Sequence, residues 1–321
     1  MLQRDLAKHY GLGAAPLGNL FAAIHEDEVD AVLDAVAALH VIHIDTAPLY
    51  GHGLSERRIG QYLATHRHSS FKLTTKVGRC LDPGEAVGSD FAEPLPLFPR
   101  FDYSRDGILR SFQDSLARLG VTKVHGLLLH DIGLRTHGES HAVIFAQAMD
   151  EALPALHELK AQGYVDVIGL GVNEWQVCAD VMRTADIDVI LLAGRYTLLE
   201  QDALAFLDYC LGRHIDVVIG GAFNSGLLAG GNVYDYAEAP NAMIRRRNRL
   251  ADICARHGVP LAAAALQFVQ AHPAVIRSVV GLRSVAEVEA FAANADRPIP
   301  AALWDAFRED GLLASEAPVP C

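Results

Sequence analysis

Four ionisable residues, each at or just after the end of an apolar run, could together transfer a proton. Asp45, Lys76 and His130 end the runs VIHID, FKLTTK and KVHGLLLH, and Tyr50 follows in the loop D-T-A-P-L-Y-G. A lysine ammonium beside a phenol favours the phenolate, and a carboxylate offsets the cost of burying that ammonium. A histidine can orient the reacting oxygen. Such a cluster moves a proton to or from a carbinol oxygen, and a redox cofactor must carry the hydride, since no side chain can.

Taken singly, each of these residues has an ordinary structural explanation. A strand-end aspartate is commonly a cap, a lysine a surface charge, a tyrosine before glycine a packing residue, and a histidine a satisfied core residue. All four, however, lie at the ends of three consecutive apolar runs. If those runs are neighbouring parallel strands, their ends meet at one face and the side chains converge.

The elements that must position this cluster alternate along the whole chain. Eight apolar runs are typical of buried parallel strands, and segments with apolar spacing of i, i+3 and i+4 between them predict amphipathic helices. The predicted strands are 11–18, 41–45, 71–76, 123–130, 165–172, 187–193, 215–222 and 274–281, and the predicted helices are 26–40, 54–65, 104–119, 146–162, 174–184, 199–212, 242–257, 260–271, 284–293 and 301–310.

Eight strand–helix units predict a single-domain α/β fold, a (β/α)8 TIM barrel over residues 1–321. A dinucleotide-binding Rossmann fold fits poorly, because G-N-L-F follows the first run in place of G-x-G-x-x-G. Long loops without a clear element are expected at 77–103, after the third strand, and at 221–240, after the seventh. We expect the tail from about residue 314 to be loosely ordered.

Composition excludes several classes of function. The chain has 321 residues, is 51% hydrophobic and 21% charged, and carries a net charge of −12, which disfavours nucleic acid and anionic membrane surfaces as partners. Five scattered cysteines without a C-x-x-C pair fit a reducing compartment, and no signal peptide or transmembrane run is evident. We expect a cytoplasmic protein without a metal, since the pair His66 and His68 lacks a nearby carboxylate. The sequence does not indicate an oligomeric state.

The motifs around the four residues resemble those of the aldo-keto reductase superfamily. D-T-A-x-x-Y-G at 45–51 followed by S-E at 55–56, T-T-K at 74–76 and L-L-L-H at 127–130 match its signature in type, order and separation. The resemblance implies that Asp45, Tyr50, Lys76 and His130 form a catalytic tetrad with Tyr50 as general acid/base. It also implies a nicotinamide dinucleotide bound without a Rossmann fold.

Several positions match the cofactor-binding segments of that superfamily, and some depart from them. The usual G-V-S-N reads Gly171-Val172-Asn173, so the serine is missing, and the usual glutamine has no equivalent in LLAGRYTLL. The resemblance implies that Asn173 binds the carboxamide and that Phe223 stacks on the nicotinamide. The remaining cofactor-binding candidates are Gly18, the loop residues Asn224, Ser225, Gly226 and Leu227, and then Gly281, Arg283 and Glu287.

Glu287 bears on the choice between NAD and NADP. It stands four residues after Arg283, where NADP-dependent members often carry an arginine for the 2′-phosphate. A carboxylate would repel that phosphate and could accept a hydrogen bond from a ribose hydroxyl, whereas Arg283 could bind phosphate. Glu287 is alternatively an exposed helix residue without a ligand. We expect NAD to be preferred, with NADP as the alternative.

Further stretches resemble the branch of this superfamily that contains sugar dehydrogenases acting on L-fucose and D-threo-aldoses, with pyridoxal and L-galactose dehydrogenases as relatives: GLGAAPLGNL, GVNEW, LLAGRYTLLEQ and NSGLL. The resemblance implies oxidation of an anomeric hydroxyl to a lactone. The candidate substrate-binding residues are Asn19, His52, Phe101, Tyr103 and Trp175. The alternatives are a pyridoxal 4-dehydrogenase or broad carbonyl reductase, a cofactor-binding regulatory subunit, and a barrel hydrolase or lyase that uses Asp45 and His130.

Overall fold

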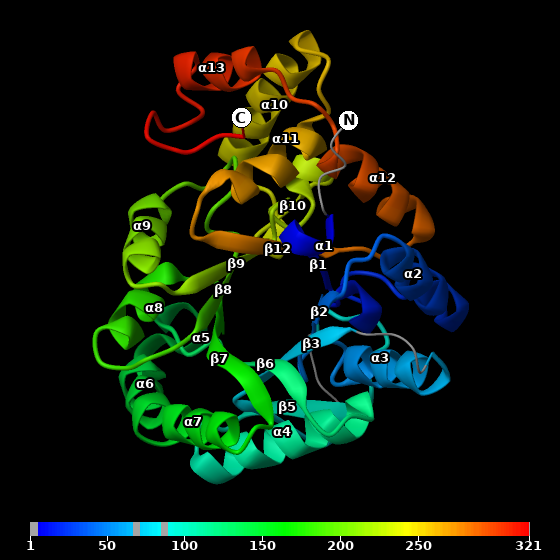
Figure 1. Cartoon of the computed structure of the whole chain (residues 1–321), viewed down its shortest axis with the longest axis vertical. Helices are drawn as coiled ribbons and strands as arrows, with labels where there is room; N and C mark the ends of the chain where they lie inside the picture. Colours follow the sequence, from blue (N-terminus) through cyan, green and yellow to red (C-terminus); the bar gives the residue numbers. More distant parts are fainter. Residues whose placement is uncertain (1–5, 67–70, 85–88, 321) are drawn as a thin grey trace.

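The computed structural model is a closed parallel barrel, in which the eight strands follow the order β1-β12-β9-β8-β7-β6-β3-β2. The structure describes residues 6–66, 71–84 and 89–320. All eight predicted strands are present, which confirms the (β/α)8 fold, and Figure 1 shows helices around the barrel. The barrel strands are β1 (Tyr10–Gly13), β2 (His43–Asp45), β3 (Lys72–Val77), β6 (Val124–His130), β7 (Val165–Val172), β8 (Val189–Ala193), β9 (Asp216–Gly220) and β12 (Val275–Gly281).

The helices of the outer layer are amphipathic, as α2 illustrates. Its Val29, Val32, Leu33 and Val36 are buried, and burial of each such side chain contributes about 1.5–3 kcal/mol to the stability of the fold. The longer helices are α2 (Glu26–Ala38), α3 (Leu54–Thr65), α4 (Arg105–Leu119), α7 (Leu153–Ala161), α8 (Trp175–Met182), α9 (Leu204–Gly212), α10 (Asn241–Arg256), α11 (Leu261–Phe268), α12 (Val285–Ala295) and α13 (Ala301–Glu309). Shorter turns are α1 (Leu6–His9), η1 (Pro16–Gly18), α5 (Leu134–His137), η2 (Gly138–Ser140), α6 (His141–Gln147), η3 (Ala148–Ala152), η4 (Leu227–Ala229) and η5 (Val269–Ala271).

The long segment after β3 contains structure that the sequence analysis did not predict. β4 (Arg79–Pro83) and β5 (Leu97–Phe101) form an antiparallel pair in which Arg79 lies opposite Phe101. The prediction of a loop without regular structure over 77–103 is therefore wrong for these ten residues. Pro83 and Pro99 argue against strands in this segment, because proline has no N–H to donate to a neighbouring strand. A two-stranded ribbon, however, has outer edges that need no N–H donor, so it tolerates proline.

The segment after β9 also carries a short ribbon. β10 (Val233–Tyr234) pairs with β11 (Ala237–Glu238), and the turn between them is formed by Asp235 and Tyr236, both with positive φ. This ribbon places the Asp235 and Tyr236 side chains beside residues that follow β8 and β7, namely Arg195 and Asn173.

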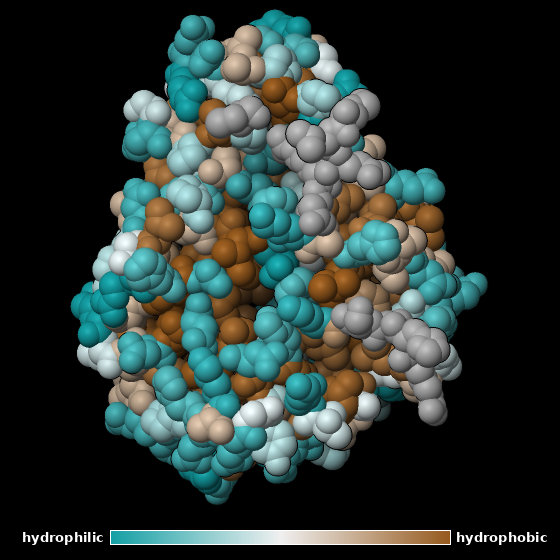
Figure 2. All heavy atoms as spheres, in the orientation of Figure 1, coloured by the Kyte–Doolittle hydropathy of each residue, from teal (hydrophilic) through white to brown (hydrophobic). Residues whose placement is uncertain are grey.

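The strand register explains why the predicted cluster converges. Asp45 pairs with Thr74, and Lys76 pairs with Leu128, two residues before His130. Side chains alternate along a strand, so Lys76 points to the same side as Thr74. The barrel interior contains a cavity of about 80 Å³ whose lining includes His43, Asp45 and Thr74. In Figure 2, apolar side chains surround a hollow at the centre of the face shown.

Candidate active site

Lys76 is the centre of a buried hydrogen-bond network. Its side chain is 2% exposed, and its ammonium donates to Asp45 Oδ2 at 2.7 Å, to the Thr46 carbonyl at 2.9 Å and to the Tyr50 hydroxyl at 3.0 Å. A lysine ammonium has three donors, so these three acceptors satisfy it completely. The buried charge is therefore held in one place, pointed at the phenol.

Two glycines make room for this network. A Cβ on Gly171 would lie 3.0 Å from Lys76 Cε, and a Cβ on Gly18 would lie 2.5 Å from the carbonyl carbon of Tyr50. Gly18 was predicted to bind cofactor. In the structure its backbone packs directly on the loop that carries Tyr50, so any side chain there would displace the phenol.

The electrostatics of the network keep Tyr50 protonated in the free protein. Burial raises the pKa of Tyr50, Lys76 lowers it, and Asp45 and Tyr236 raise it, with the net result that the pKa is about 12. Lys76 thus lowers the pKa of Tyr50 as predicted, but burial raises this pKa by more. Burial disfavours the Lys76 ammonium, yet Asp45 and Tyr50 raise the pKa of Lys76 above its ordinary value. Lys76 is therefore charged, and Tyr50 is a phenol able to donate.

His130 ends β6 beside the phenol. Its ring lies 6.4 Å from the Tyr50 ring, at an interplanar angle of 86°. Burial, then Arg79 and Lys76, hold the pKa of His130 well below its ordinary value. The structure thus brings all four predicted residues together, and His130 is a neutral imidazole at the edge of the group.

The predicted substrate-binding residues divide into two groups. Asn19 and Tyr103 make structural hydrogen bonds: the Asn19 side-chain oxygen accepts from the Ile24 N–H at 3.1 Å and from Arg58 at 2.8 Å, and the Tyr103 hydroxyl donates to the His130 carbonyl at 2.7 Å. Both side chains are buried. Neither side chain is therefore free to contact a substrate, contrary to the sequence prediction. Tyr103 instead holds the backbone of His130 in place.

The other three candidates differ in exposure. Phe101 is 40% exposed, Trp175 is partly buried, and His52 is buried with its Nε2 3.3 Å from Ser89 Oγ. The ring of Phe91, which the sequence analysis did not single out, lies 6.1 Å from Tyr50 and 6.4 Å from His52. Aromatic surface therefore adjoins the phenol.

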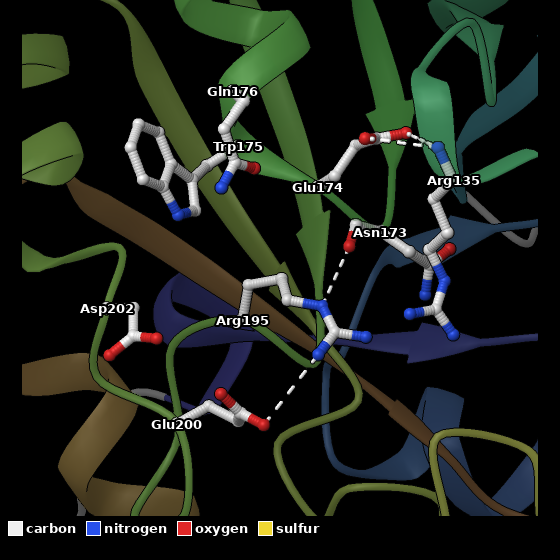
Figure 3. A pocket seen from close by; sticks show the side chains of 8 residues that line it. All are labelled: Arg135, Asn173, Glu174, Trp175, Gln176, Arg195, Glu200 and Asp202. Atoms are coloured by element: carbon white, nitrogen blue, oxygen red, sulfur yellow. Dashed lines mark hydrogen bonds and ion pairs between the residues drawn. The ribbon is translucent and has the colours of Figure 1, made fainter. Parts of the chain in front are cut away.

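Asn173 and Trp175 line a pocket of about 250 Å³ at the end of β7 (Figure 3). The Asn173 side-chain amide donates to the Tyr236 hydroxyl at 3.4 Å, and the Asn173 backbone carbonyl accepts from Arg195 at 2.7 Å. Figure 3 shows Arg195 between the Asn173 carbonyl and Glu200. Since Tyr236 also influences the pKa of Tyr50, it connects this pocket with the tetrad.

The loop after β9 carries the predicted pyrophosphate-binding residues. Asn224 and Ser225 have φ values of 47° and 58°, and Gly226 has a φ of 98°. Asn224 donates to the Gly194 carbonyl at 3.3 Å, while its own side-chain oxygen is buried and accepts no hydrogen bond from the described residues. Leu227 is fully buried, and Phe223 packs partly buried against the core. The unsatisfied Asn224 oxygen leaves an acceptor for a bound group.

Glu287 has a structural role at the start of α12. Ser284 caps the helix by accepting from the Glu287 N–H at 3.2 Å, and Glu287 accepts from the Arg283 N–H at 2.9 Å. Its carboxylate also lies 3.8 Å from the Arg283 guanidinium. Reciprocal capping of this kind stabilises a helix N-terminus. It also keeps the carboxylate beside Arg283.

The sequence analysis missed six polar residues around the site. Arg79 and Asp131 contact His130, Tyr236 contacts Asn173, and Arg195 and Arg135 both bind Asp235. Asp131 directly follows His130 and Arg79 follows Lys76 by three residues, so proximity in sequence was the available signal for these two. Of the other four, Arg195, Asp235 and Tyr236 lie in bends and turns and Arg135 lies in the four-residue helix α5, so none of them carries a periodic signal.

The part of the chain that the structure describes contains no group of three or more His, Cys, Asp or Glu arranged to hold a metal, and no helix there is long and apolar enough to span a bilayer. His68, one of the H-x-H pair, lies outside the described residues. His66 stacks on the Tyr62 ring at 4.0 Å.

Comparisons with known proteins identify the class. The model of the aldo/keto reductase family matches residues 10–309. The chain is 39% identical to pyridoxal 4-dehydrogenase from Microbacterium luteolum, covering 95% of this chain and 94% of that protein, and 39% identical to D-threo-aldose 1-dehydrogenase from a Pseudomonas species, covering 94% of each. The chain therefore belongs to the aldo/keto reductase family and is an oxidoreductase; enzymes of this family use NAD(P)H.

A solved structure confirms the fold independently. The holo form of aldo-keto reductase AKR11C1 from Bacillus halodurans superposes with a TM-score of 0.75, at 22% identity, over 96% of this chain and 93% of that one. At this identity the likeness concerns the barrel alone.

Proposed function

We propose that this protein is an NAD-dependent dehydrogenase that oxidises the anomeric hydroxyl of an aldose to a lactone. The observation that carries the proposal is the buried network in which Lys76 donates to both Tyr50 and Asp45. Such a network serves proton transfer at a carbinol oxygen. A cyclic hemiacetal supplies such an oxygen on a carbon that can lose hydride.

The four residues have distinct roles in the proposed reaction. Bound NAD supplies the acceptor for the hydride that leaves C1. Oxidation needs Tyr50 as the phenolate, so the phenol first gives its proton to solvent, and Lys76 stabilises the resulting anion while Asp45 holds Lys76 in place. The Tyr50 phenolate then takes the hydroxyl proton, and the C1–O bond becomes the carbonyl of the lactone. In the reverse direction the Tyr50 phenol donates its proton. His130 donates a hydrogen bond to the reacting oxygen.

The remaining cofactor residues support a dinucleotide site. Asn173 lines the pocket together with Trp175, and its side-chain amide, which donates to Tyr236, fits the carboxamide end of a nicotinamide. The Asn224 side-chain oxygen has no hydrogen-bond partner among the described residues and can accept a hydrogen bond from a hydroxyl or amide group of the dinucleotide. Glu287 supports NAD over NADP, since its carboxylate lies against Arg283 and would repel a 2′-phosphate.

A second substrate, pyridoxal, is favoured by a separate observation. The ring of Phe91 lies 6.1 Å from the Tyr50 ring, and Phe101 exposes 40% of its surface. An aromatic substrate ring stacks well on such surfaces, and pyridoxal forms a cyclic hemiacetal that is oxidised by the same steps. A non-catalytic regulatory subunit is disfavoured by the complete tetrad. A hydrolase using Asp45 is disfavoured because Lys76 already engages that carboxylate.

The test is formation of reduced nicotinamide by the purified protein, followed by absorbance. NAD and NADP are supplied separately, with L-fucose, L-galactose, D-arabinose and pyridoxal as substrates. Turnover of NAD with one of the aldoses is the expected result. Turnover with pyridoxal alone would retain the mechanism and replace the substrate. Tight cofactor binding without turnover of any substrate would favour the regulatory role.

A further inference from the structure

Arg79 is an arginine buried against the tetrad that the proposed mechanism does not use. It begins β4, immediately after Gly78, and is 8% exposed. One guanidinium nitrogen lies 3.3 Å from His130 Nδ1 and another lies 2.8 Å from Asp131 Oδ2. Its guanidinium carbon lies 4.6 Å from the centre of the Phe101 ring. Three neighbours thus hold the side chain in one orientation.

The contact between Arg79 and His130 determines which imidazole nitrogen carries the proton. A guanidinium can only donate hydrogen bonds, because arginine does not lose its proton in proteins. His130 Nδ1 must therefore be the acceptor of this bond. In a neutral imidazole one nitrogen accepts and the other donates, so the proton of His130 is on Nε2.

We infer that Arg79 is a positioning residue that fixes the tautomer of His130, so that Nε2–H is directed to the reacting oxygen. The inference rests on the proposed function only for the last step, the contact with substrate. The assignment of the tautomer itself depends on geometry alone. Gly78 makes this geometry possible, since a Cβ there, at φ 102°, would lie 2.4 Å from the Tyr103 ring.

Arg79 also controls the acidic neighbour of His130. Asp131 Oδ2 lies 3.5 Å from His130 Nε2, and the same oxygen accepts a hydrogen bond from Arg79. The guanidinium thus offsets the charge that would otherwise draw a second proton onto the imidazole. Within the described part of the chain, Nε2 makes no hydrogen bond of its own, so its N–H remains available for a substrate.

The positively charged groups that face His130 disfavour protonation of its imidazole to the imidazolium. Lys76 on β3 and Arg79 on β4 carry positive charges, and the nearby Tyr50 ring belongs to a neutral phenol. Tyr103 donates its hydroxyl to the His130 carbonyl and lies 3.2 Å from His137 Nε2. Burial lowers the pKa of His137. Asp131 is thus the one negative group among these neighbours, and Arg79 is bound to it.

The decisive experiment observes His130 directly. Two-dimensional 15N–1H NMR of histidine-labelled protein distinguishes the two neutral tautomers and the imidazolium, and His130→Gln identifies the signals. We expect a neutral His130 protonated on Nε2 in the wild type, without substrate or cofactor. A proton on Nδ1 in the wild type would overturn the inference. This result does not depend on whether any substrate is turned over, so it separates the inference from the proposed function.

Substitutions in the ribbon formed by β4 and β5 test whether Arg79 determines the tautomer of His130. In Arg79→Met we expect the imidazolium at neutral pH, because Asp131 then attracts a second proton onto the ring, and an acid limb of the kcat profile moved upward by at least about one pH unit. Arg79→Lys, which still only donates, should restore the wild-type tautomer. Arg100→Met is the matched control, since Arg100 binds Asp82 and Asp102 at the surface. Unchanged His130 signals in Arg79→Met would contradict the inference; if that variant does not fold, the wild-type and lysine spectra decide.

Discussion

The Lys76 ammonium lies 3.0 Å from the Tyr50 hydroxyl oxygen and donates a hydrogen bond to it, while Asp45 holds the same ammonium at 2.7 Å. The two contacts have different roles. Asp45 allows a positive charge to persist in a buried position, and in the proposed reaction that charge on Lys76 stabilises the phenolate form of Tyr50. Neither residue needs to touch the substrate for the reaction to depend on both.

Replacing Lys76 by methionine should destabilise the fold as well as abolish turnover. The substitution leaves the Asp45 carboxylate buried without a counter-charge, and removal of one partner of a buried pair costs about 3–5 kcal/mol. The double variant Asp45→Asn, Lys76→Met removes both charges and should recover most of that loss while remaining inactive. Urea unfolding of the three proteins measures the effect. A double variant as unstable as the single one would refute the ion-pair explanation.

The protein should lose stability in mild acid, in part through His43. Burial, then Arg277, His125 and Lys72, lower the pKa of His43 to about 3. Below its ordinary pKa of 6.5 the unfolded chain binds a proton that the folded chain does not, so the free energy of unfolding falls as the pH decreases toward 3. His130 acts in the same direction.

The variant His43→Gln isolates this contribution. Urea midpoints measured between pH 7 and pH 4, a range of about three units around the ordinary histidine pKa, should decrease less steeply in the variant than in the wild type. Equal slopes would mean that His43 is protonated in the folded protein.

Gly18→Ala should reduce turnover by shifting Tyr50. The new Cβ would lie 2.5 Å from the Tyr50 carbonyl carbon, so the loop has to move, and a displacement of about 1 Å can cost about a hundredfold in rate. Gly212→Ala at the end of α9 is the matched control, because its Cβ would meet nothing within 4 Å. Steady-state rates and thermal unfolding of both variants provide the comparison. Wild-type turnover in Gly18→Ala would show that the loop adapts.

Glu287→Gln should improve the use of NADP relative to NAD. Glutamine keeps an acceptor for the Arg283 N–H but removes the charge that opposes a 2′-phosphate. We expect the ratio of kcat/KM for NADP over NAD to rise about tenfold, which corresponds to about 1.4 kcal/mol. Glu289→Gln, in the same helix and exposed, controls for net charge. Equal ratios in the two variants would remove Glu287 from cofactor selection.

Sequence reasoning could group these four residues because Asp45 and His130 end regular strands, Lys76 is the penultimate residue of one, and Tyr50 follows five residues after Asp45. The apolar runs predict the barrel, the barrel brings strand ends together, and the register places Asp45 and Lys76 side by side. Burial then sets the pKa of Tyr50 at about 12. The sequence could indicate only the opposing effect of Lys76, because the depth of burial depends on the packed fold.

The partners of the site could not be predicted in the same way. Arg79 meets His130 from 51 residues away, Tyr236 meets Asn173 from 63 residues away, and Arg195 meets Asp235 from 40 residues away. Arg79 and His130 are strand ends next to irregular segments, and the other two contacts join such segments directly; the paths of these segments depend on residues with positive φ, such as Asp131 and Asp235. Conversely, the sequence predicts Asn19 and Tyr103 as substrate-binding residues, but in the structure both are buried and make hydrogen bonds within the protein.

Tyr50→Phe tests the central claim most directly, because it removes one oxygen from the phenol that Lys76 contacts. The measurement is the rate of NAD reduction by the preferred substrate, together with the Kd for NAD from fluorescence titration. We predict that the rate falls by about 10²–10⁴-fold, the usual contribution of a general acid/base, while the Kd stays within about twofold. A rate close to that of the wild type would contradict the assignment of Tyr50 as the proton-transferring residue.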